Sequence, residues 1–171
     1  RKITNDSKFP IMIDEEGGSV TRLSSIINNY YTQKTFGDIY QSNNKVGLFF
    51  FKEHIKKVSN FLKKIGVNVN TVPVLDVLRK NTNKIIGNRS FSTNPNTVKK
   101  LGLFCVKQYE INNLVTSIKH IPGHGCASLD SHLKMPIVKL NKRNLEKIDF
   151  FPFKSNPSKI AMTAHIMYKK I

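Results

Sequence analysis

Short apolar runs that end in polar residues recur along the chain and predict the strands of a parallel sheet. The runs occupy residues 10–13, 69–75, 114–118 and 160–164. Their nearly continuous apolar character is typical of strands that are covered on both faces. An acidic residue or a histidine lies just past the end of each run: Asp14, Asp76, His120 and His165.

Apolar residues at helical spacing lie between these runs. In residues 44–65 they are Val46, Phe50, Val58, Phe61, Leu62 and Ile65. Lysines occupy much of the other side, so the pattern predicts an amphipathic helix, and Gly66 stands where a left-handed C-cap belongs. We expect a third helix to start near Asn141 and to be broken by Pro152.

The second helix is predicted to follow Pro95 and to stop at Asn112 and Asn113. Four of its side chains share one face at a 3.6-residue period: Val98, Leu101, Cys105 and Tyr109. Strands that alternate with helices indicate an α/β fold, in which a parallel sheet is joined by right-handed crossovers.

The polar residues at the strand ends favour a closed (β/α) barrel over a dinucleotide-binding sheet. Chemistry spread over the carboxyl ends of several strands is typical of the barrel, whereas the dinucleotide fold concentrates its signature in one Gly-rich turn. No GxGxxG motif occurs. A whole barrel takes about 250 residues. The 171 residues therefore correspond either to an open sheet or to part of a barrel.

Composition and charge exclude several classes of protein. The chain is 39% hydrophobic, which is ordinary for a folded domain, and no run is long enough to span a membrane. Its net charge of +17 raises the question of a nucleic-acid partner. However, 23 of the 28 basic residues are lysines, scattered in pairs, and Arg and stacking aromatic residues are few. We therefore expect a solvated basic surface, with no nucleic-acid partner and no membrane partner. The two cysteines form no disulfide framework, which fits a reducing compartment.

Residues 119–132 carry the densest chemistry, with three of the five histidines. Three interpretations compete for this loop. Its ligand-type residues (His120, His124, Asp130 and His132) would suit a metal, although no metal-binding spacing occurs. The histidines could simply hydrogen-bond backbone atoms. In an acid/base interpretation, Asp130 fixes the tautomer of His132, which then transfers a proton.

The same loop, K-H-x-P-G-H-G-(four residues)-D-S-H, resembles the signature loop of glycoside hydrolase family 3 β-N-acetylglucosaminidases. Four other segments are similar to motifs of this family and occur in the same order. They are D-x-E-G-G-x-V-x-R at 14–22, P-V-L-D at 73–76, I-G-x-R-S-F at 86–91 and M-x-A-H at 162–165.

The resemblance implies a partial (β/α)8 TIM-type barrel that comprises about the second to fifth βα units. Residues 1–171 would then be the family's N-terminal catalytic domain, incomplete at both ends. The implied enzyme is a retaining hydrolase that removes terminal β-linked N-acetylglucosamine from muropeptides in cytoplasmic cell-wall recycling. It would use no cofactor and would be a monomer when complete.

Site residues follow from the matching motif positions. The resemblance implies that His132 is the general acid/base and Asp130 its partner. It implies that five residues grip the sugar: Asp14, Arg22, Arg89, Lys119 and His120. No metal is implied.

Simpler roles stay open for several of these residues. Asp14 could cap the following turn, Arg22 could lie on the surface, and Arg89 could pair with Asp76. Glu15 and Glu16 are interpreted as supports or as solvent-facing residues. His165 would brace the barrel rim, outside the site.

One departure concerns the nucleophile, which in the family is an Asp on a loop after a later strand. The last Asp of the chain is Asp149, before the predicted strand at 160–164. We therefore expect this chain alone to lack the nucleophile and to be inactive. Two alternatives are a degenerate gene product without activity and a zinc-dependent hydrolase that uses the histidine loop.

Overall fold

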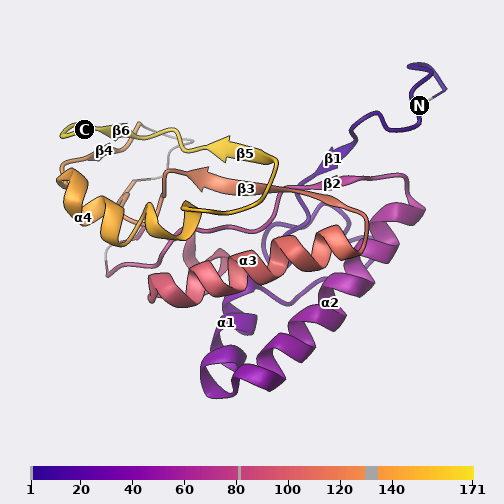
Figure 1. The fold of residues 1–171 in the computed structure, drawn as a ribbon, viewed down its shortest axis with the longest axis horizontal. Helices are drawn as coiled ribbons and strands as arrows, with labels where there is room; N and C mark the ends of the chain where they lie inside the picture. Colours follow the sequence, from indigo (N-terminus) through magenta and orange to yellow (C-terminus); the bar gives the residue numbers. More distant parts are fainter. Residues whose placement is uncertain (1, 81, 130–134) are drawn as a thin grey trace.

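A computed structural model of the chain describes residues 2–80, 82–129 and 135–171. Four parallel strands form its main sheet, in the order β1-β2-β3-β5 (Figure 1). Their bounds are β1 (Met12–Ile13), β2 (Val69–Asn70), β3 (Val115–Ile121) and β5 (Ile160–Thr163). A separate parallel pair joins β4 (Ile137–Val138) to β6 (Met167–Tyr168). The four predicted strands are confirmed, in chain order.

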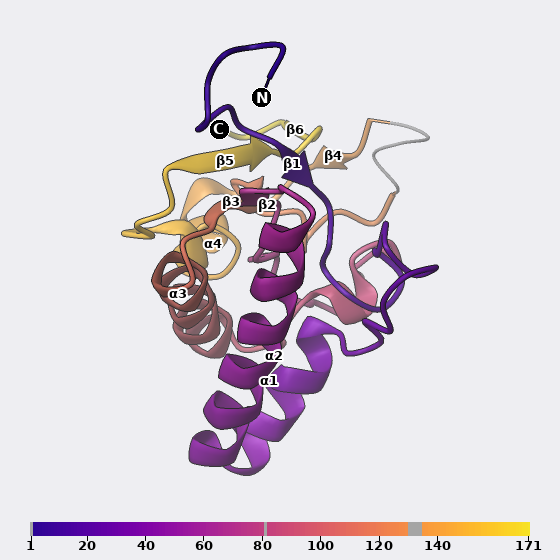
Figure 2. The ribbon, with the colours of Figure 1, turned by 90° about the vertical axis from the view of Figure 1, so that its right-hand side faces the viewer.

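Three helices cover one face of the main sheet, as Figures 1 and 2 show. They are α1 (Gln33–Ser42), α2 (Asn44–Lys64) and α3 (Pro95–Ile111). The shorter helical segments are α4 (Lys142–Lys147) and the 3₁₀ turns η1 (Gly87–Arg89) and η2 (Phe151–Phe153). Parallel strands linked through helices on one side form part of a barrel wall.

Local capping explains where these helices begin and end. The Asn43 side chain accepts the backbone N–H of Val46 at 3.1 Å, and Asn141 does the same for Asn144 at 3.0 Å. Gly66, with φ +85°, follows α2 as predicted. Helix α4 starts where expected but stops at Lys147, well before Pro152. The predicted end is wrong because Asp149 turns inward to pair with Arg79.

Helix α1 was not predicted, because it is only ten residues long and Phe36, Ile39 and Tyr40 are its only large apolar residues. Its one clear local signal is a capping box, in which Thr32 and Thr35 bond each other's backbone N–H groups.

The predicted buried face of α3 is confirmed, since Val98, Leu101, Cys105 and Tyr109 are all buried. The predicted face of α2 is partly wrong: Val46, Phe50 and Ile65 are 41%, 53% and 47% exposed. The buried face instead carries Gly47, Phe51, Ile55, Val58, Ser59 and Leu62. The reason is α1: a Cβ on Gly47 would lie 2.5 Å from the Tyr40 backbone, so the two helices meet at this glycine.

Strand β2 is shorter than predicted because Pro73 has no N–H to donate to the ladder. The chain stays extended beyond it, and the backbone N–H of Leu75 donates to the carbonyl of Lys119 at 2.7 Å. Asp76 is thereby held beside the end of β3.

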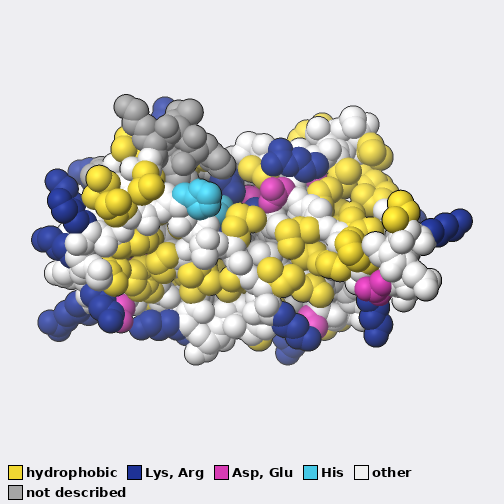
Figure 3. Space-filling model, turned by 90° about the horizontal axis from the view of Figure 1, so that it is seen from above, with side chains coloured by type: hydrophobic (Ala, Val, Ile, Leu, Met, Phe, Trp, Pro, Cys, Tyr) yellow, Lys and Arg dark blue, Asp and Glu magenta, His cyan; other side chains and the backbone are white. Residues whose placement is uncertain are grey.

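The two faces of the sheet differ sharply. On the helix side, Ile118 belongs to the core, and the Asn70 amide donates to the Tyr109 hydroxyl in α3 at 3.2 Å. Side chains alternate between faces, so Met12, Val115 and Met162 point the other way, and they are 49%, 39% and 36% exposed. Figure 3 shows apolar side chains along this open face, with imidazole, carboxylate and basic groups near its middle.

Candidate active site

Lys119 lies at the centre of a charged cluster near the carboxyl ends of β1, β2 and β3. Its ammonium group donates to Asp14 Oδ1 at 2.8 Å and to Thr71 Oγ1 at 3.0 Å, and lies 2.5 Å from Glu16 Oε1. The Lys119 side chain is only 2% exposed. Its three N–H directions thus meet three oxygen partners, which offsets the cost of burying the charge.

Asp14 presents the more accessible carboxylate of this cluster, with its side chain 33% exposed. Its Oδ1 accepts from both Lys119 and the Thr71 hydroxyl, whereas the Arg22 guanidinium lies 3.6 Å from Oδ2. Burial opposes ionisation, but the hydrogen bonds from Lys119 and Thr71 and the charges of Lys119 and Arg22 lower the pKa of Asp14 to about 2. Asp14 is therefore a permanent acceptor near neutral pH.

Arg89 pairs with Glu16, rather than with Asp76 as one simpler interpretation held. Its Nε and Nη2 contact the two Glu16 oxygens at 2.8 and 2.9 Å, and its Nη1 donates to the carbonyl of Ile85 at 3.1 Å. Burial works against the charged guanidinium, yet the hydrogen bond and charge of Glu16 raise the pKa of Arg89. This two-bond geometry fixes the plane of the guanidinium.

Glu15 and Glu16 are both buried, so their interpretation as solvent-facing residues is wrong. Glu15 accepts from the Thr21 hydroxyl at 2.6 Å, from the Arg22 backbone at 2.9 Å and from the Asn29 amide at 2.7 Å. It thereby organises the loop that carries Arg22. The side chain of Arg22 is itself 62% exposed and reaches over Asp14.

Asp76 is fully buried and binds the start of the histidine loop. One oxygen lies 2.6 Å from His120 Nδ1, and the other accepts the His124 backbone N–H at 2.6 Å. Burial raises the pKa of Asp76, but the hydrogen bond and charge of His120 outweigh this effect and lower it. Burial also lowers the pKa of His124. An ionised Asp76 fixes the His120 tautomer with a proton on Nδ1.

The two glycines of the histidine loop serve different needs. Gly123 has φ +137°, a conformation that side chains disfavour, and its carbonyl accepts from the Tyr168 hydroxyl at 2.7 Å. Gly125 provides space instead, since a Cβ there would lie 1.9 Å from the Val77 carbonyl oxygen. The loop is therefore packed tightly against the extended segment that follows β2.

Polar residues of the loop that precedes η1 also hold the histidine loop. The Thr82 hydroxyl donates to the Gly125 carbonyl at 2.6 Å, and the Asn83 backbone donates to the Ala127 carbonyl at 3.1 Å. The loop thus reaches residue 129 in a defined position. The predicted acid/base His132 and its partner Asp130 lie outside the described residues.

A small cavity of about 60 Å³ adjoins this cluster. Arg89, His120, His124 and His165 are among its lining residues. His165 is not among the predicted site residues, although its place at a strand end is a usable signal. Thr71 was missed as part of the cluster, because no sequence motif points to it, whereas Glu16, interpreted as a support, contacts both Arg89 and Lys119.

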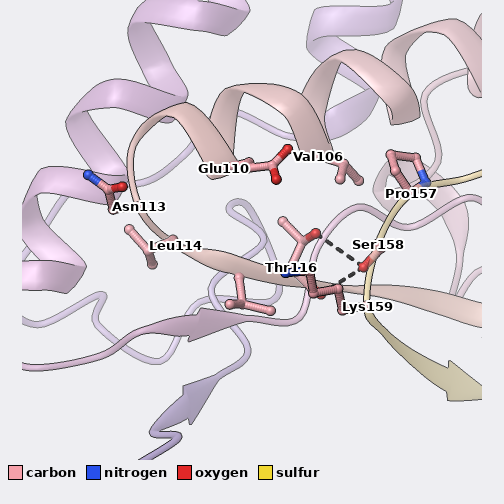
Figure 4. Close-up of a pocket in the computed structure, with 9 residues that line it drawn as sticks. Val106, Glu110, Asn113, Leu114, Thr116, Pro157, Ser158 and Lys159 are labelled. Atoms are coloured by element: carbon pink, nitrogen blue, oxygen red, sulfur yellow. Dashed lines mark hydrogen bonds between the residues drawn. The ribbon is translucent and has the colours of Figure 1, made fainter. Parts of the chain in front are cut away.

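A larger cavity of about 290 Å³ opens at the amino-terminal ends of β3 and β5 (Figure 4). It lies between α3 and the segment that precedes β5, where the Ser158 hydroxyl donates to the Thr116 carbonyl at 2.8 Å. Glu110 and Lys159 flank it, and both are exposed. In barrels of this kind the amino-terminal end serves stability and the opposite end serves chemistry.

Two further observations bear on the alternatives. Across residues 2–80, 82–129 and 135–171, no group of three or more His, Cys, Asp or Glu side chains is placed to hold a metal ion. Within the same ranges, no helix combines the length and apolar character needed to cross a membrane.

Comparisons with known proteins agree with the motif resemblance. Residues 2–171 match the family described as glycosyl hydrolase family 3 N terminal domain. The chain is 38% identical over 170 residues to beta-hexosaminidase A of Pseudoalteromonas piscicida, covering 92% of this chain and 27% of that protein. It is 34% identical over 165 residues to a beta-hexosaminidase of Neisseria gonorrhoeae, covering 94% of this chain and 45% of that protein. The chain thus spans less than half the length of these two relatives.

A solved structure of similar fold is NagZ from Neisseria gonorrhoeae in complex with N-trifluoroacetyl-D-glucosamine. The TM-score is 0.83 and the sequence identity 30%, covering 93% of this chain and 48% of NagZ. This agreement confirms the predicted fold class, a partial TIM-type α/β barrel.

Proposed function

Because the chain belongs to the glycosyl hydrolase family 3 N-terminal domain family, we propose that it provides the sugar-binding part of a β-N-acetylhexosaminidase. The reaction is the hydrolysis of a terminal β-linked N-acetylglucosamine. The names of the two beta-hexosaminidase relatives and the N-trifluoroacetyl-D-glucosamine bound to NagZ support this substrate. In this proposal residues 1–171 belong to a single catalytic domain.

The observation that carries the proposal is the state of Asp14. Its carboxylate is ionised, partly exposed and held from behind by Lys119, which is 2% exposed. Such a group accepts hydrogen bonds from sugar hydroxyls without changing its protonation near neutral pH. The Arg22 guanidinium lies 3.6 Å from Asp14 and offers N–H donors to a sugar oxygen. Hydrogen bonds that involve a charged group are stronger than neutral ones.

The other sugar-binding residues divide into two kinds. We assign His120 to substrate contact, because Asp76 takes its Nδ1 and leaves Nε2 for a hydroxyl. Lys119 and Arg89 bind the acidic residues around the site, so they shape the sugar pocket and supply its positive charge.

His132 carries the proton chemistry in this proposal, oriented by Asp130. It donates its proton to the glycosidic oxygen while the bond to the anomeric carbon breaks and an enzyme carboxylate bonds to that carbon. In the second step, His132 takes a proton from the water that attacks the same carbon, the bond from this carbon to the enzyme carboxylate breaks, and the sugar is released with its configuration retained. No cofactor takes part.

The biological setting follows from the family resemblance. The substrate we propose is an N-acetylglucosaminyl-anhydromuropeptide from peptidoglycan, handled in the cytoplasm during cell-wall recycling. We also propose that the enzyme acts as a monomer.

Replacement of His132 tests the proposal in the protein that contains residues 1–171. His132→Ala should lower turnover by about 10²- to 10⁴-fold, as expected for a lost acid/base. Nitrophenyl glycosides should lose least in the glycosylation step, because their leaving group needs no proton. Measurement of that step by rapid mixing, on nitrophenyl and natural substrates, checks both expectations.

Two results would contradict the proposal. Equal losses on both substrates in the glycosylation step would make His132 a structural residue. About one zinc per chain by elemental analysis, with activity lost to a chelator, would favour the zinc-dependent hydrolase instead.

A further inference from the structure

We propose that Thr71 is a positioning residue for sugar recognition: its hydroxyl bridges Lys119 and Asp14 and turns Asp14 Oδ2 toward the substrate. This inference rests on the proposed function, because it assumes that Asp14 accepts a sugar hydroxyl. It adds a residue that no family motif of the chain contains.

The backbone fixes Thr71 beside β1. Its N–H donates to the carbonyl of Ile13 at 2.9 Å, one residue before Asp14, and Thr71 is 2% exposed. The direction of its side-chain bonds is also fixed. Lys119 can only donate, so the Thr71 hydroxyl accepts from Nζ at 3.0 Å and sends its own proton to Asp14 Oδ1.

The two oxygens of Asp14 are consequently unequal. Oδ1 accepts both from the Thr71 hydroxyl and from Lys119 Nζ at 2.8 Å. Oδ2 has the Arg22 guanidinium at 3.6 Å, which is beyond hydrogen-bond range. The oxygen left for a hydroxyl donor is therefore Oδ2.

One donor alone would not hold this orientation. The terminal torsion of an aspartate is broad, so a carboxylate bound only by Lys119 can rotate about its axis. Lys119 is itself shared, because Glu16 Oε1 lies 2.5 Å from the same nitrogen. A second donor from a different strand restricts the rotation, and Thr71 supplies it.

The test compares Thr71→Val, which removes the hydroxyl at nearly constant shape, with Thr71→Ser, which retains it. Both are made in the protein that contains residues 1–171 and assayed with nitrophenyl N-acetylglucosaminide. We expect Thr71→Val to lower kcat/KM about tenfold, mainly through KM, in line with one lost bond to a charged group. Thr71→Ser should stay within about threefold of the parent. The matched control is Thr116→Val, since Thr116 is also buried, at 4% exposed, but bonds Ser158 at the other end of β3.

A double-mutant cycle with Asp14→Asn separates positioning from general stability. In the Asp14→Asn background, Thr71→Val should change kcat/KM less than twofold, because the oriented carboxylate is already gone. The loss caused by Thr71→Val should also grow at acidic pH, because one of the bonds that lower the Asp14 pKa is missing.

Each contrary outcome has a distinct meaning. If Asp14→Asn is harmless, the proposed function fails. If Asp14→Asn is damaging while Thr71→Val is harmless, only the Thr71 inference fails. An equal loss from Thr71→Val in both backgrounds, or no rescue by serine, also overturns it. Should Thr71→Val not fold, Thr71→Ala takes its place in the same cycle. Thr71→Ala should then show the loss expected of Thr71→Val, and the expectation for Thr71→Ser is unchanged.

Discussion

Titratable groups are buried in two regions: at the rim of the sheet, near the carboxyl ends of β1, β2 and β3, and in the helix layer formed by α1, α2 and α3. The two regions differ in whether these groups are charged. At the rim, the Asp14 carboxylate stays ionised because the Lys119 ammonium group lies 2.8 Å away and lowers its pKa. In the helix layer, His54 of α2 packs against the rings of Phe36 and Tyr31, with centroids 4.8 and 6.2 Å away. Burial and the nearby charge of Lys57 lower the pKa of His54 to about 4.

Two other helix-layer groups follow the same rule as His54. Burial raises the pKa of both Cys105 and Tyr109, so both stay neutral. The decisive difference between the regions is therefore the supply of partners, since burial alone always disfavours charge. Charges that persist at the rim are available for polar recognition, and the helix layer supplies neutral packing beneath them.

The largest expected effect concerns the open face next to the rim. Residues 1–171 alone should hydrolyse nitrophenyl N-acetylglucosaminide no faster than buffer, and should aggregate or bind a hydrophobic dye. The reason is the exposed apolar face formed by Met12, Val115 and Met162, together with the expected lack of a nucleophile. Dye fluorescence and a nitrophenol assay on the purified chain measure both.

Matched variants localise this effect. Changing Met12 and Met162 to Ser should lower dye binding more than changing Phe49 to Ser, although Phe49 on α2 is 61% exposed. A chain extended by the later barrel units of a relative, including an S-D-D-like loop, should gain solubility and turnover. Clear catalysis by the homogeneous 171-residue chain would instead make Asp14 the first candidate nucleophile.

The next effect comes from breaking the rim. Lys119→Met, in the protein that contains this chain, should lower the free energy of unfolding by about 3 kcal/mol, because Asp14 loses its buried cation and the buried Glu16 keeps only Arg89. Urea denaturation measures the loss. The control is Lys159→Met at the amino-terminal cavity, where the lysine is exposed and the change should stay within about 0.5 kcal/mol. Equal effects of the two variants would contradict the contrast between the regions.

How far the sequence predicts this molecule depends on the range of the interactions. The strands, Gly66 and the buried face of α3 follow from local patterns, and the structure confirms them. The Thr71–Asp14 and Thr71–Lys119 contacts join residues 57 and 48 positions apart, and no local pattern encodes such contacts.

Other misses have the same physical origin. The face of α2 is set by α1 at Gly47, so the periodicity of α2 alone selected partly wrong residues. The partner of Arg89 is Glu16, 73 positions away, which the sequence predicts only as a support or a surface residue. The motifs identified charged side chains near the site, whereas the pairing of these side chains depends on how the strands are arranged in space.

The smallest expected effect tests the helix layer through pH. The folded-state pKa of His54 is about 4, below the ordinary histidine value of 6.5. Below pH 6.5 His54 is protonated in the unfolded chain, whereas in the folded chain it binds a proton only near pH 4. The free energy of unfolding therefore falls as the pH drops through this window. Between pH 7 and pH 5, His54 should account for a loss of about 2 kcal/mol. His54→Phe keeps a ring in the cluster but cannot titrate, so its unfolding free energy should fall by that much less over the same interval. Urea denaturation of the protein that contains this chain, at both pH values, measures the difference.

The control is His165→Asn, which removes an exposed histidine and should change the slope of unfolding free energy against pH far less. A His54→Phe variant with the parent's slope would mean that His54 is protonated in its aromatic cluster, and the contrast between a charged rim and a neutral helix layer would fail.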